Sequence, residues 1–314
     1  MDFMDSIDDV VAWLLEGDAP IRYQTWRDLL GEDRPDLATL IATEGDAALL
    51  LAARHQDGHW GRGFYQPKWT SSHYTLLELR NLELPHEHPA ARETVQLILR
   101  ETGSDGGVNP SASIAHSDAC VNGMFLDYAS WFGATYADLA GVLDFLLDQR
   151  MPDGGYNCRR NRSGARIASV HTTVSVIEGF TSYLAAGDTR RADDVANARN
   201  AAVECLLARE LFRRRGSLEP IDIEFTRLHH PARWHFDVLR ALDALRAAKV
   251  SYDDRMAPAL DVVRHRQRSD GRWAANRGYA GQTQIRYPAA GQPNRWVTLR
   301  ALRVLSTYPA PPSL

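Results

Sequence analysis

The sequence is short of cysteine, of long apolar stretches and of basic charge. Its 314 residues include three cysteines, Cys120, Cys158 and Cys205, which are too few and too scattered for a disulfide framework and indicate a reducing compartment. No apolar stretch approaches the roughly 18 residues that suggest a membrane span. The 36 basic and 40 acidic residues give a formal net charge of −4, which argues against nucleic acid as a partner.

The N-terminal segment also lacks the features of a targeting sequence. Residues 1–16 carry five acidic residues and no basic flank, so neither a signal peptide nor a transit peptide is expected. We therefore expect a cytoplasmic protein.

What the sequence does contain is a recurring turn, an Asp-Gly pair followed by small or aromatic residues. The first three copies are spaced 48 residues apart, and the fourth follows after 117, which leaves room for two units with one turn worn away near residues 213–216. Such a period means that each unit is one supersecondary element whose apolar face is covered by its neighbours. The four copies are Asp57-Gly58, Asp105-Gly106, Asp153-Gly154 and Asp270-Gly271.

Helices are expected almost everywhere between these turns, because apolar residues recur at every third and fourth position and β-branched runs of period two are absent. One set is expected at residues 20–30, 70–84, 118–132, 169–184, 231–247 and 295–308. A second set alternates with it at residues 6–16, 35–55, 89–101, 136–150, 190–211 and 252–267. The pattern predicts an all-α fold, an α6/α6 toroid in which six inner helices and six outer helices form a double ring, as one domain over residues 1–314.

Three of the turns resemble a known repeat. They read Gln-Asp-Gly-His-Trp-Gly at residues 56–61, Pro-Asp-Gly-Gly-Tyr at 152–156 and Ser-Asp-Gly-Arg-Trp at 269–273. This resembles the repeat of the terpenoid cyclase and protein prenyltransferase superfamily, which includes squalene-hopene cyclases and the β subunits of protein prenyltransferases. The resemblance runs roughly from residue 56 to the C-terminus and implies a squalene-cyclase-like toroid, of the single-domain bacterial type.

The acidic motifs of the cyclases are missing. Squalene-hopene-type cyclases protonate an alkene with a D-x-D-D motif, and the ionising cyclases use D-D-x-x-D. The acidic pairs of this chain lack the further acids that either motif requires, so neither mechanism is assigned. These pairs are Asp8-Asp9, Asp193-Asp194 and Asp253-Asp254.

A zinc site is implied by the resemblance to the prenyltransferase β subunits. Those proteins hold zinc with a D-x-C pair where one inner helix begins and with a His one repeat later. Here Asp118 and Cys120 form the pair, and His171 follows 53 residues after Asp118. Three such ligands leave the fourth position of Zn2+ open for water or substrate. The metal-free interpretation stays open, with Asp118 as a helix cap, Cys120 as a small buried residue and His171 as a hydrogen-bonded wall residue.

Other polar and aromatic residues fall at equivalent helix starts, where we expect them to line the mouth of the central cavity. His235, His116, Trp69 and His73 are the candidates for acid–base chemistry and for shaping the reaction site. Cys158, in the loop before His171, is either a less favoured fourth ligand of the zinc or a plain loop thiol.

A bound molecule or cofactor is assigned to a second group of residues. Trp234 and Trp296 offer aromatic faces to it. Arg159 and Arg160 belong to a basic loop that grips an anionic group or is simply a solvated surface. Residues 109–115 lack the basic side chains that help the prenyltransferases to grip a diphosphate.

The leading hypothesis is a zinc-dependent enzyme that resembles the prenyltransferase β subunits. It would act on a hydrophobic, isoprenoid-like molecule, or on a thiol or anionic one, in an apolar, aromatic-lined cavity. The α subunit that the protein prenyltransferases require is not contained in this chain. The alternatives are a metal-free cyclase in which Trp69, Trp234 and Trp296 stabilise a carbocation, a non-catalytic toroid that binds a lipid or a partner, and, ranked last, a carbohydrate-active toroid with Asp118 and Asp237 as its carboxylates.

Overall fold

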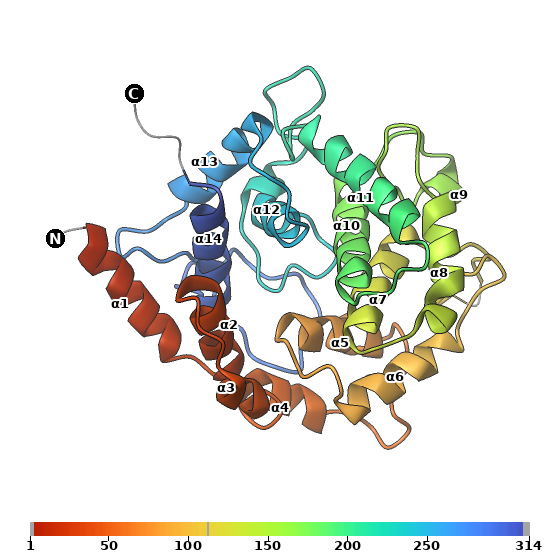
Figure 1. Cartoon of the computed structure of the whole chain (residues 1–314), viewed down its shortest axis with the longest axis horizontal. Coiled ribbons are helices and arrows are strands. Elements are labelled where there is room, and N and C mark those ends of the chain that lie inside the picture. The colour runs from red at the N-terminus through yellow and green to blue at the C-terminus, as the bar shows by residue number, and fades with distance from the viewer. Residues whose placement is uncertain (1–2, 112, 310–314) are drawn as a thin grey trace.

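Two alternating sets of helices wind around one axis in the computed structural model, which describes residues 3–111 and 113–309 (Figure 1). The described residues contain no β-strand, only isolated bridges such as that between Thr102 and Val108. The all-α class predicted from the sequence is therefore confirmed.

The inner ring follows the order of the chain and closes on itself. From α5 onward each inner helix contacts the next one, and the last contacts the first. The remaining junction, from the first inner helix to the second, is bridged by Gln24, whose side chain donates to the carbonyl of Asn81 at 2.9 Å. The six helices are α2 (Ala19–Leu29), α5 (Ser72–Asn81), α7 (Ala119–Trp131), α10 (Val170–Ala185), α12 (Val238–Ala247) and α14 (Arg295–Thr307).

The outer helices surround this ring (Figure 1). Most of them alternate with the inner helices, as the toroid requires. They are α1 (Phe3–Leu15), α3 (Pro35–Leu40), α4 (Gly45–Ala52), α6 (Pro89–Leu99), α8 (Tyr136–Asp148), α11 (Ala192–Leu207) and α13 (Ala257–His265), and the loops add the short α9 (Arg160–Ser163), η1 (Lys68–Thr70), η2 (Ile223–Thr226) and η3 (Asp254–Met256).

The helix expected at residues 35–55 is wrong as a single element. It is divided into α3 and α4, because Gly45 adopts a φ of +62°, which an L side chain rarely adopts. A Cβ at Gly45 would also lie 2.5 Å from Oδ2 of Asp18, so the chain breaks where the start of α2 packs against it.

The helix expected at residues 231–247 begins later than predicted. Asp237 caps α12, and its Oδ1 accepts the backbone N–H of Arg240 at 2.8 Å. Residues 231–237 are therefore loop, and this loop reaches the middle of the ring.

The Asp-Gly turns join outer helices to inner helices in the same way in each unit. All four glycines have φ between +75° and +86°. Two residues later, a buried backbone N–H donates to a polar side chain in the first turn of the next inner helix, a bond that contributes about 1 kcal/mol. These pairs are Trp60 with Ser72 at 3.0 Å, Val108 with Asn122 at 2.7 Å, Tyr156 with Thr173 at 3.1 Å and Trp273 with Thr298 at 3.0 Å.

The turn that has lost its Asp-Gly pair lies near residues 213–216, as the sequence predicts. Gly216 has a φ of +68°, and a bridge pairs Arg213 with Pro220 around the turn. The unit keeps its link to the next inner helix through a different side chain, because the backbone N–H of His229 donates to Oδ2 of Asp237 at 3.0 Å.

Helices α7 and α10 form the closest contact of the ring. A Cβ on Gly179 would lie 2.3 Å from the carbonyl oxygen of Gly123, and one on Gly123 would lie 2.7 Å from that of Ser175. Glycine is tolerated inside these helices because the two backbones touch there. Nearly every side chain of α7 is buried, as expected for an inner helix.

Candidate functional site

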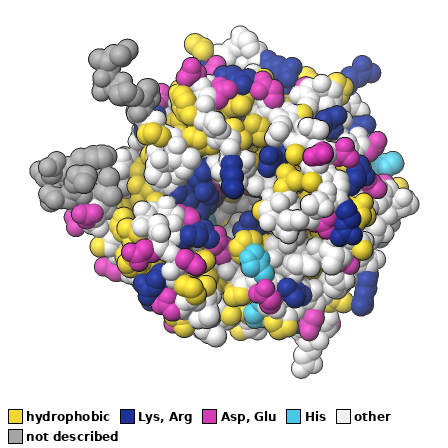
Figure 2. All heavy atoms as spheres, viewed as in Figure 1, with side chains coloured by type: hydrophobic (Ala, Val, Ile, Leu, Met, Phe, Trp, Pro, Cys, Tyr) yellow, Lys and Arg dark blue, Asp and Glu magenta, His cyan; other side chains and the backbone are white. Residues whose placement is uncertain are grey.

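A cavity of about 170 Å³ lies in the middle of the ring. It is more than ten times the roughly 10–15 Å³ that one water needs on this measure, so it has room for a small molecule. Figure 2 shows the hollow at the centre of one face, with Lys and Arg side chains beside it. All six inner helices contribute to its wall, mainly with their C-terminal halves, through Arg27, Arg80, Asp127, Glu178, Asp243 and Arg303, among others.

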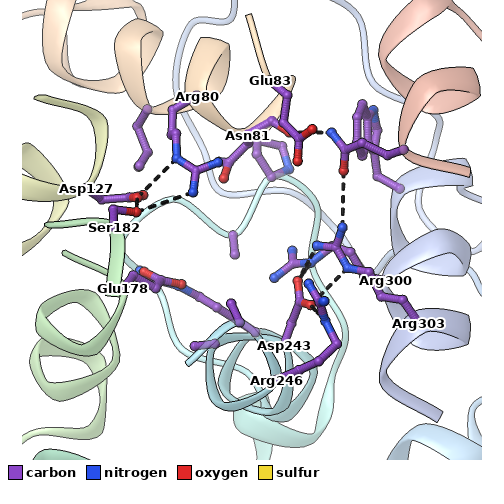
Figure 3. A pocket seen from close by; sticks show the side chains of 18 of the residues that line it. Arg80, Asn81, Glu83, Asp127, Glu178, Ser182, Asp243, Arg246, Arg300 and Arg303 are labelled. Atoms are coloured by element: carbon purple, nitrogen blue, oxygen red, sulfur yellow. Dashed lines mark hydrogen bonds and ion pairs between the residues drawn. The ribbon is translucent and has the colours of Figure 1, made fainter. Parts of the chain in front are cut away.

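Asp243 is the centre of the ion pairs on one side of this cavity. Arg246 and Arg300 contact its carboxylate through Nε at 2.9 and 3.2 Å, and Arg303 binds it as well (Figure 3). Burial raises the pKa of Asp243, but Arg303 and the other two guanidinium groups outweigh burial and hold that pKa well below its usual range. The carboxylate therefore stays charged at neutral pH.

The same network continues to α2. Arg303 reaches Asp28 at 3.1 Å, and Arg27 binds both Asp28 at 2.7 Å and Glu83 at 2.9 Å. The burial of these groups makes the network expensive to interrupt, because removing one partner leaves the others charged and uncompensated.

The opposite wall carries two separate pairs. Nε of Arg80 lies 3.2 Å from Asp127, which also accepts the hydroxyl of Ser182 (Figure 3). Arg240 binds Glu178 at 2.9 Å and donates to the Ser175 hydroxyl oxygen at 3.0 Å.

Positive charge exceeds negative charge around the cavity. Its wall has seven arginines and four carboxylates, and Asp28, just behind it, offsets one further charge. Arg246 and Arg300 contact Asp243 through Nε, and their terminal nitrogens make no hydrogen bond to the described residues. The apolar, aromatic lumen expected from the sequence is thus not what lines this cavity.

Glu78 of α5 is a buried carboxyl group beside the cavity. It lies in a small side cavity with Tyr287 and Arg233, and Arg233 also lines the central cavity. Burial raises the pKa of Glu78 to about 7, so this group exchanges its proton near neutral pH.

The three predicted zinc ligands lie where α7 and α10 begin, as expected, but each has another partner. The Asp118 carboxylate pairs with Arg162 and makes no side-chain cap. The backbone N–H of Cys120 donates to Sγ of Cys158 at 3.1 Å. The Nδ1 atom of His171 accepts the backbone N–H of Phe236 at 2.8 Å.

These partners make the three residues a poor fit to a zinc site as they are placed. Across residues 3–111 and 113–309, no group of three or more His, Cys, Asp and Glu side chains is arranged to hold a metal ion. Burial, aided by Arg240, lowers the pKa of His171 to about 4, so the ring is neutral at pH 7. Zinc therefore stays a prediction of the resemblance.

Aromatic rings pack closely around His171 at this end of the ring. His235 stacks on Tyr279 and on Trp234, with centroid distances of 3.3 and 3.8 Å. Trp69 donates to the carbonyl of Ala280 at 2.6 Å, so the loop between α13 and α14 lies over it. Burial lowers the pKa of His235 to about 3, which leaves its ring neutral and a weak base.

The other predicted site residues are dispersed. His73 is fully buried against Tyr128, whose hydroxyl lies 3.1 Å from its Nδ1, and His116 is exposed. Arg159 is exposed, and Arg160 donates to the carbonyl of Asp148 at 2.7 Å, away from the cavity.

Trp296 and the carboxylates give a mixed outcome. Trp296 is part of the cavity wall, where it stacks on His230. Asp118 and Asp237, the pair of carboxylates expected for a carbohydrate-active toroid, are not part of that wall, because Asp118 pairs with Arg162 and Asp237 caps α12.

The ionic cavity was missed by the sequence analysis because the search followed the N-terminal ends of the inner helices. A signal was present in the last turns of these helices, which carry arginines although the inner ring is otherwise buried. Arg27, Arg80 and Arg246 lie at such positions.

No helix in the described part of the chain is long and apolar enough to cross a membrane.

Comparisons with known proteins identify the architecture. No protein-family model matches the chain, and no curated protein does. A family 88 glycosyl hydrolase from Bacteroides vulgatus superimposes with a TM-score of 0.56 and 8% identity, covering 98% of this chain and 99% of its own. A polysaccharide lyase superimposes with a TM-score of 0.52 and 10% identity over 97% and 98% of the two chains.

A type II terpene cyclase from Scytonema aligns over 86% of this chain and 96% of its own, with a TM-score of 0.35 and 14% identity. At identities this low, the two closer superpositions establish a shared fold and carry no information on the reaction. The chain has the α/α toroid fold, as its repeat and its resemblance to the terpenoid cyclases predict.

Proposed function

We propose that the protein binds a small anionic molecule in the central cavity and that any turnover takes place there. The observation that carries this proposal is the excess of arginines in the wall, with the terminal nitrogens of Arg246 and Arg300 free of partners among the described residues. Guanidinium groups bind phosphate and carboxylate oxygens through paired N–H donors, so the ligand is a molecule that carries one of these two groups.

The energetics favour an anion over a neutral ligand. Each hydrogen bond to a charged group contributes about 1.5–3 kcal/mol, and the low dielectric of the ring interior strengthens it. Arg246 and Arg300 share the single carboxylate of Asp243 with Arg303, which also pairs with Asp28. An entering anion therefore neutralises charge that the protein itself leaves unbalanced.

Isothermal titration tests this proposal with inorganic pyrophosphate and glucuronate as the two anionic probes. Glucose is the matched neutral probe for glucuronate, because the two sugars differ in their carboxylate. We expect binding of at least one anion, no binding of glucose and a fall in affinity with added salt.

Arg300→Gln removes two charged donors from the cavity and is expected to weaken binding about 10-fold or more. Arg264→Gln is the control, because Arg264 pairs with Asp261 on the outer helix α13, outside the cavity wall. Absence of binding by both anions, or equal binding by the parent and the folded Arg300→Gln variant, overturns the proposal.

A zinc-dependent reaction, as in the prenyltransferase β subunits, is a second proposal. Asp118 and Cys120 begin α7 and His171 begins α10, and these two helices are neighbours, which supports it. Metal analysis of the purified protein tests it beside the Cys120→Ala and His171→Ala variants. About one zinc per chain, lost in both folded variants, is the expected result, and a protein purified without chelators that holds no metal contradicts it.

The metal-free cyclase alternative rests on the rings around His235. Its test is incubation of the protein with a C15 and a C30 isoprenoid in the presence of EDTA, followed by mass spectrometry of the extract. A cyclised product supports this alternative. If the protein instead retains the unchanged lipid tightly, the result favours the alternative of a non-catalytic toroid that binds a lipid.

A further inference from the structure

Two cysteines far apart in the sequence lie in contact at the N-terminal end of the inner ring. The backbone N–H of Cys120, in the first turn of α7, donates to Sγ of Cys158 at 3.1 Å. The Thr172 hydroxyl lies 3.5 Å from the Cys158 sulfur, so α7, α10 and the loop before α9 meet at this point.

The three cysteines of the chain differ in access to solvent. Cys120 and Cys158 are both partly exposed, and neither is engaged in a disulfide. Cys205, in α11, is buried at 3% exposure and packs against Met151 and Ala168 instead. The chain therefore offers one pair of cysteines that are partly exposed as residues, and one buried cysteine as its internal control.

We propose that Cys120 and Cys158 form a reversible disulfide and act as a redox site that is separate from the anion cavity. With hydrogen peroxide as the oxidant, the Cys158 sulfur attacks one peroxide oxygen and releases water, which leaves a sulfenic acid on Cys158. The Cys120 sulfur then attacks the Cys158 sulfur, the S–O bond breaks, and a second water leaves. Two thiols and one peroxide thus give one disulfide and two waters, with two electrons passing from sulfur to oxygen.

The order of the two steps follows from the donors around each sulfur. Cys158 accepts the Cys120 backbone N–H and has the Thr172 hydroxyl beside it, so negative charge on this sulfur is stabilised as it attacks. Cys120 supplies the second thiol, already in contact, which makes closure of the disulfide faster than overoxidation of Cys158.

The disulfide would tie the start of α7 to the loop that carries α9. This loop is otherwise held to α7 by the ion pair of Arg162 with Asp118, and Arg162 is 44% exposed in its side chain. An exposed ion pair contributes little to holding a loop, whereas a disulfide fixes it covalently. Oxidation is therefore expected to order the loop over residues 157–166.

The test treats the full-length protein with a twofold excess of hydrogen peroxide. Free thiols are then counted after unfolding in the presence of an alkylating agent, and the digest is mapped by mass spectrometry. We expect two of the three thiols to disappear, with a peptide linked through Cys120 and Cys158 and 2 Da lighter than the two separate peptides. Dithiothreitol should restore both thiols, and Cys205→Ser should behave as the parent does.

The single variants separate the roles of the two sulfurs. Cys120→Ser should accumulate a Cys158 sulfenic acid that dimedone traps, because its resolving thiol is missing. Cys158→Ser should keep its remaining thiols under the same peroxide. The thermal midpoint of the oxidised parent should exceed that of the reduced parent, with no such difference in either variant.

Several results overturn the proposal. These are three free thiols in the treated parent, a disulfide between two chains in place of the internal one, and thiols that react only after a bound metal is stripped by a chelator. None of these outcomes bears on anion binding by the central cavity, because the wall of that cavity contains no cysteine in the described part of the chain.

Discussion

The two ends of the inner ring differ in their side chains, which are charged at one end and aromatic at the other. The C-terminal halves of the helices surround a cavity with seven arginines and four carboxylates (Figure 3). The N-terminal ends carry packed rings, with His171 next to Trp234 and His235 stacked on Tyr279. The same six helices therefore surround a charged cavity at one end and packed aromatic side chains at the other.

This difference shows that in a toroid one end of the ring can hold an open cavity while loops close the other end. The loops that follow the outer helices, at residues 230–237 and 274–294, cover the aromatic end, where Trp69 donates to Ala280. At the charged end the arginines are held around the hollow by carboxylates, and one of these, Asp243, binds three of them. The aromatic side chains fill the space at their end of the helix ring, whereas the ion pairs at the other end surround an open cavity.

The largest expected effect comes from interrupting the charged end at its centre. Asp243→Asn leaves Arg246, Arg300 and Arg303 without their shared carboxylate, and we expect a loss of about 3–5 kcal/mol in the free energy of unfolding. Urea unfolding followed by circular dichroism measures it.

Asp261→Asn is the matched control for that change. Asp261 pairs with Arg264 on α13, where its side chain is 57% exposed, so a loss within about 1 kcal/mol is expected. Equal losses in the two variants would mean that the buried network does not organise the cavity.

A smaller effect on stability is expected at the contact between α7 and α10, two helices that contribute to both ends of the ring. Gly179→Ala places a Cβ against the carbonyl of Gly123 and should cost about 1–3 kcal/mol in the free energy of unfolding. Gly278→Ala is the control, because a Cβ there meets no atom within 4 Å. A neutral Gly179→Ala variant would show that the two helices separate without loss.

The smallest expected effect is on the pH dependence of stability, which differs between His171 at one end of the ring and Asp243 at the other. The pKa of His171 is lowered in the folded state, so the unfolded state binds its proton first as pH falls, and stability is lost from about pH 6.5 down to about pH 4. From that shift we expect a loss on the order of 1–2 kcal/mol between pH 7 and pH 5. Asp243, whose pKa is also lowered, loses its contribution only below about pH 4, the ordinary range of a carboxyl group.

Urea unfolding of the parent and of His171→Asn at pH 7 and pH 5 measures this difference. The asparagine oxygen still accepts the N–H of Phe236, so the variant keeps the contact and loses the titrating ring. The same loss of stability in both proteins on going to pH 5 would assign the acid sensitivity to other groups.

Much of the fold could be predicted because its signals are local. The glycines of the Asp-Gly turns take a positive φ, and the helices between them follow from apolar periodicity. The two deviations also have local causes, the left-handed conformation of Gly45 and the Asp237 cap. Periodicity does not report either, because each depends on one residue.

The candidate site was harder to predict than the fold. Position along the repeat correctly placed Asp118, Cys120 and His171 at helix starts, but their partners come from distant segments. Arg162 binds Asp118 and the Phe236 amide binds His171.

The repeat, the helices and the ring follow from the amino-acid sequence, because each unit contains the same turn and the same apolar period. The chemistry at the centre of the ring depends on contacts between helices that are distant in the sequence. Asp28, Asp243 and Arg303 lie on three different inner helices, and no spacing in the chain says that they meet. Closure of the ring brings them together, and their burial in a medium of low dielectric gives that meeting its strength.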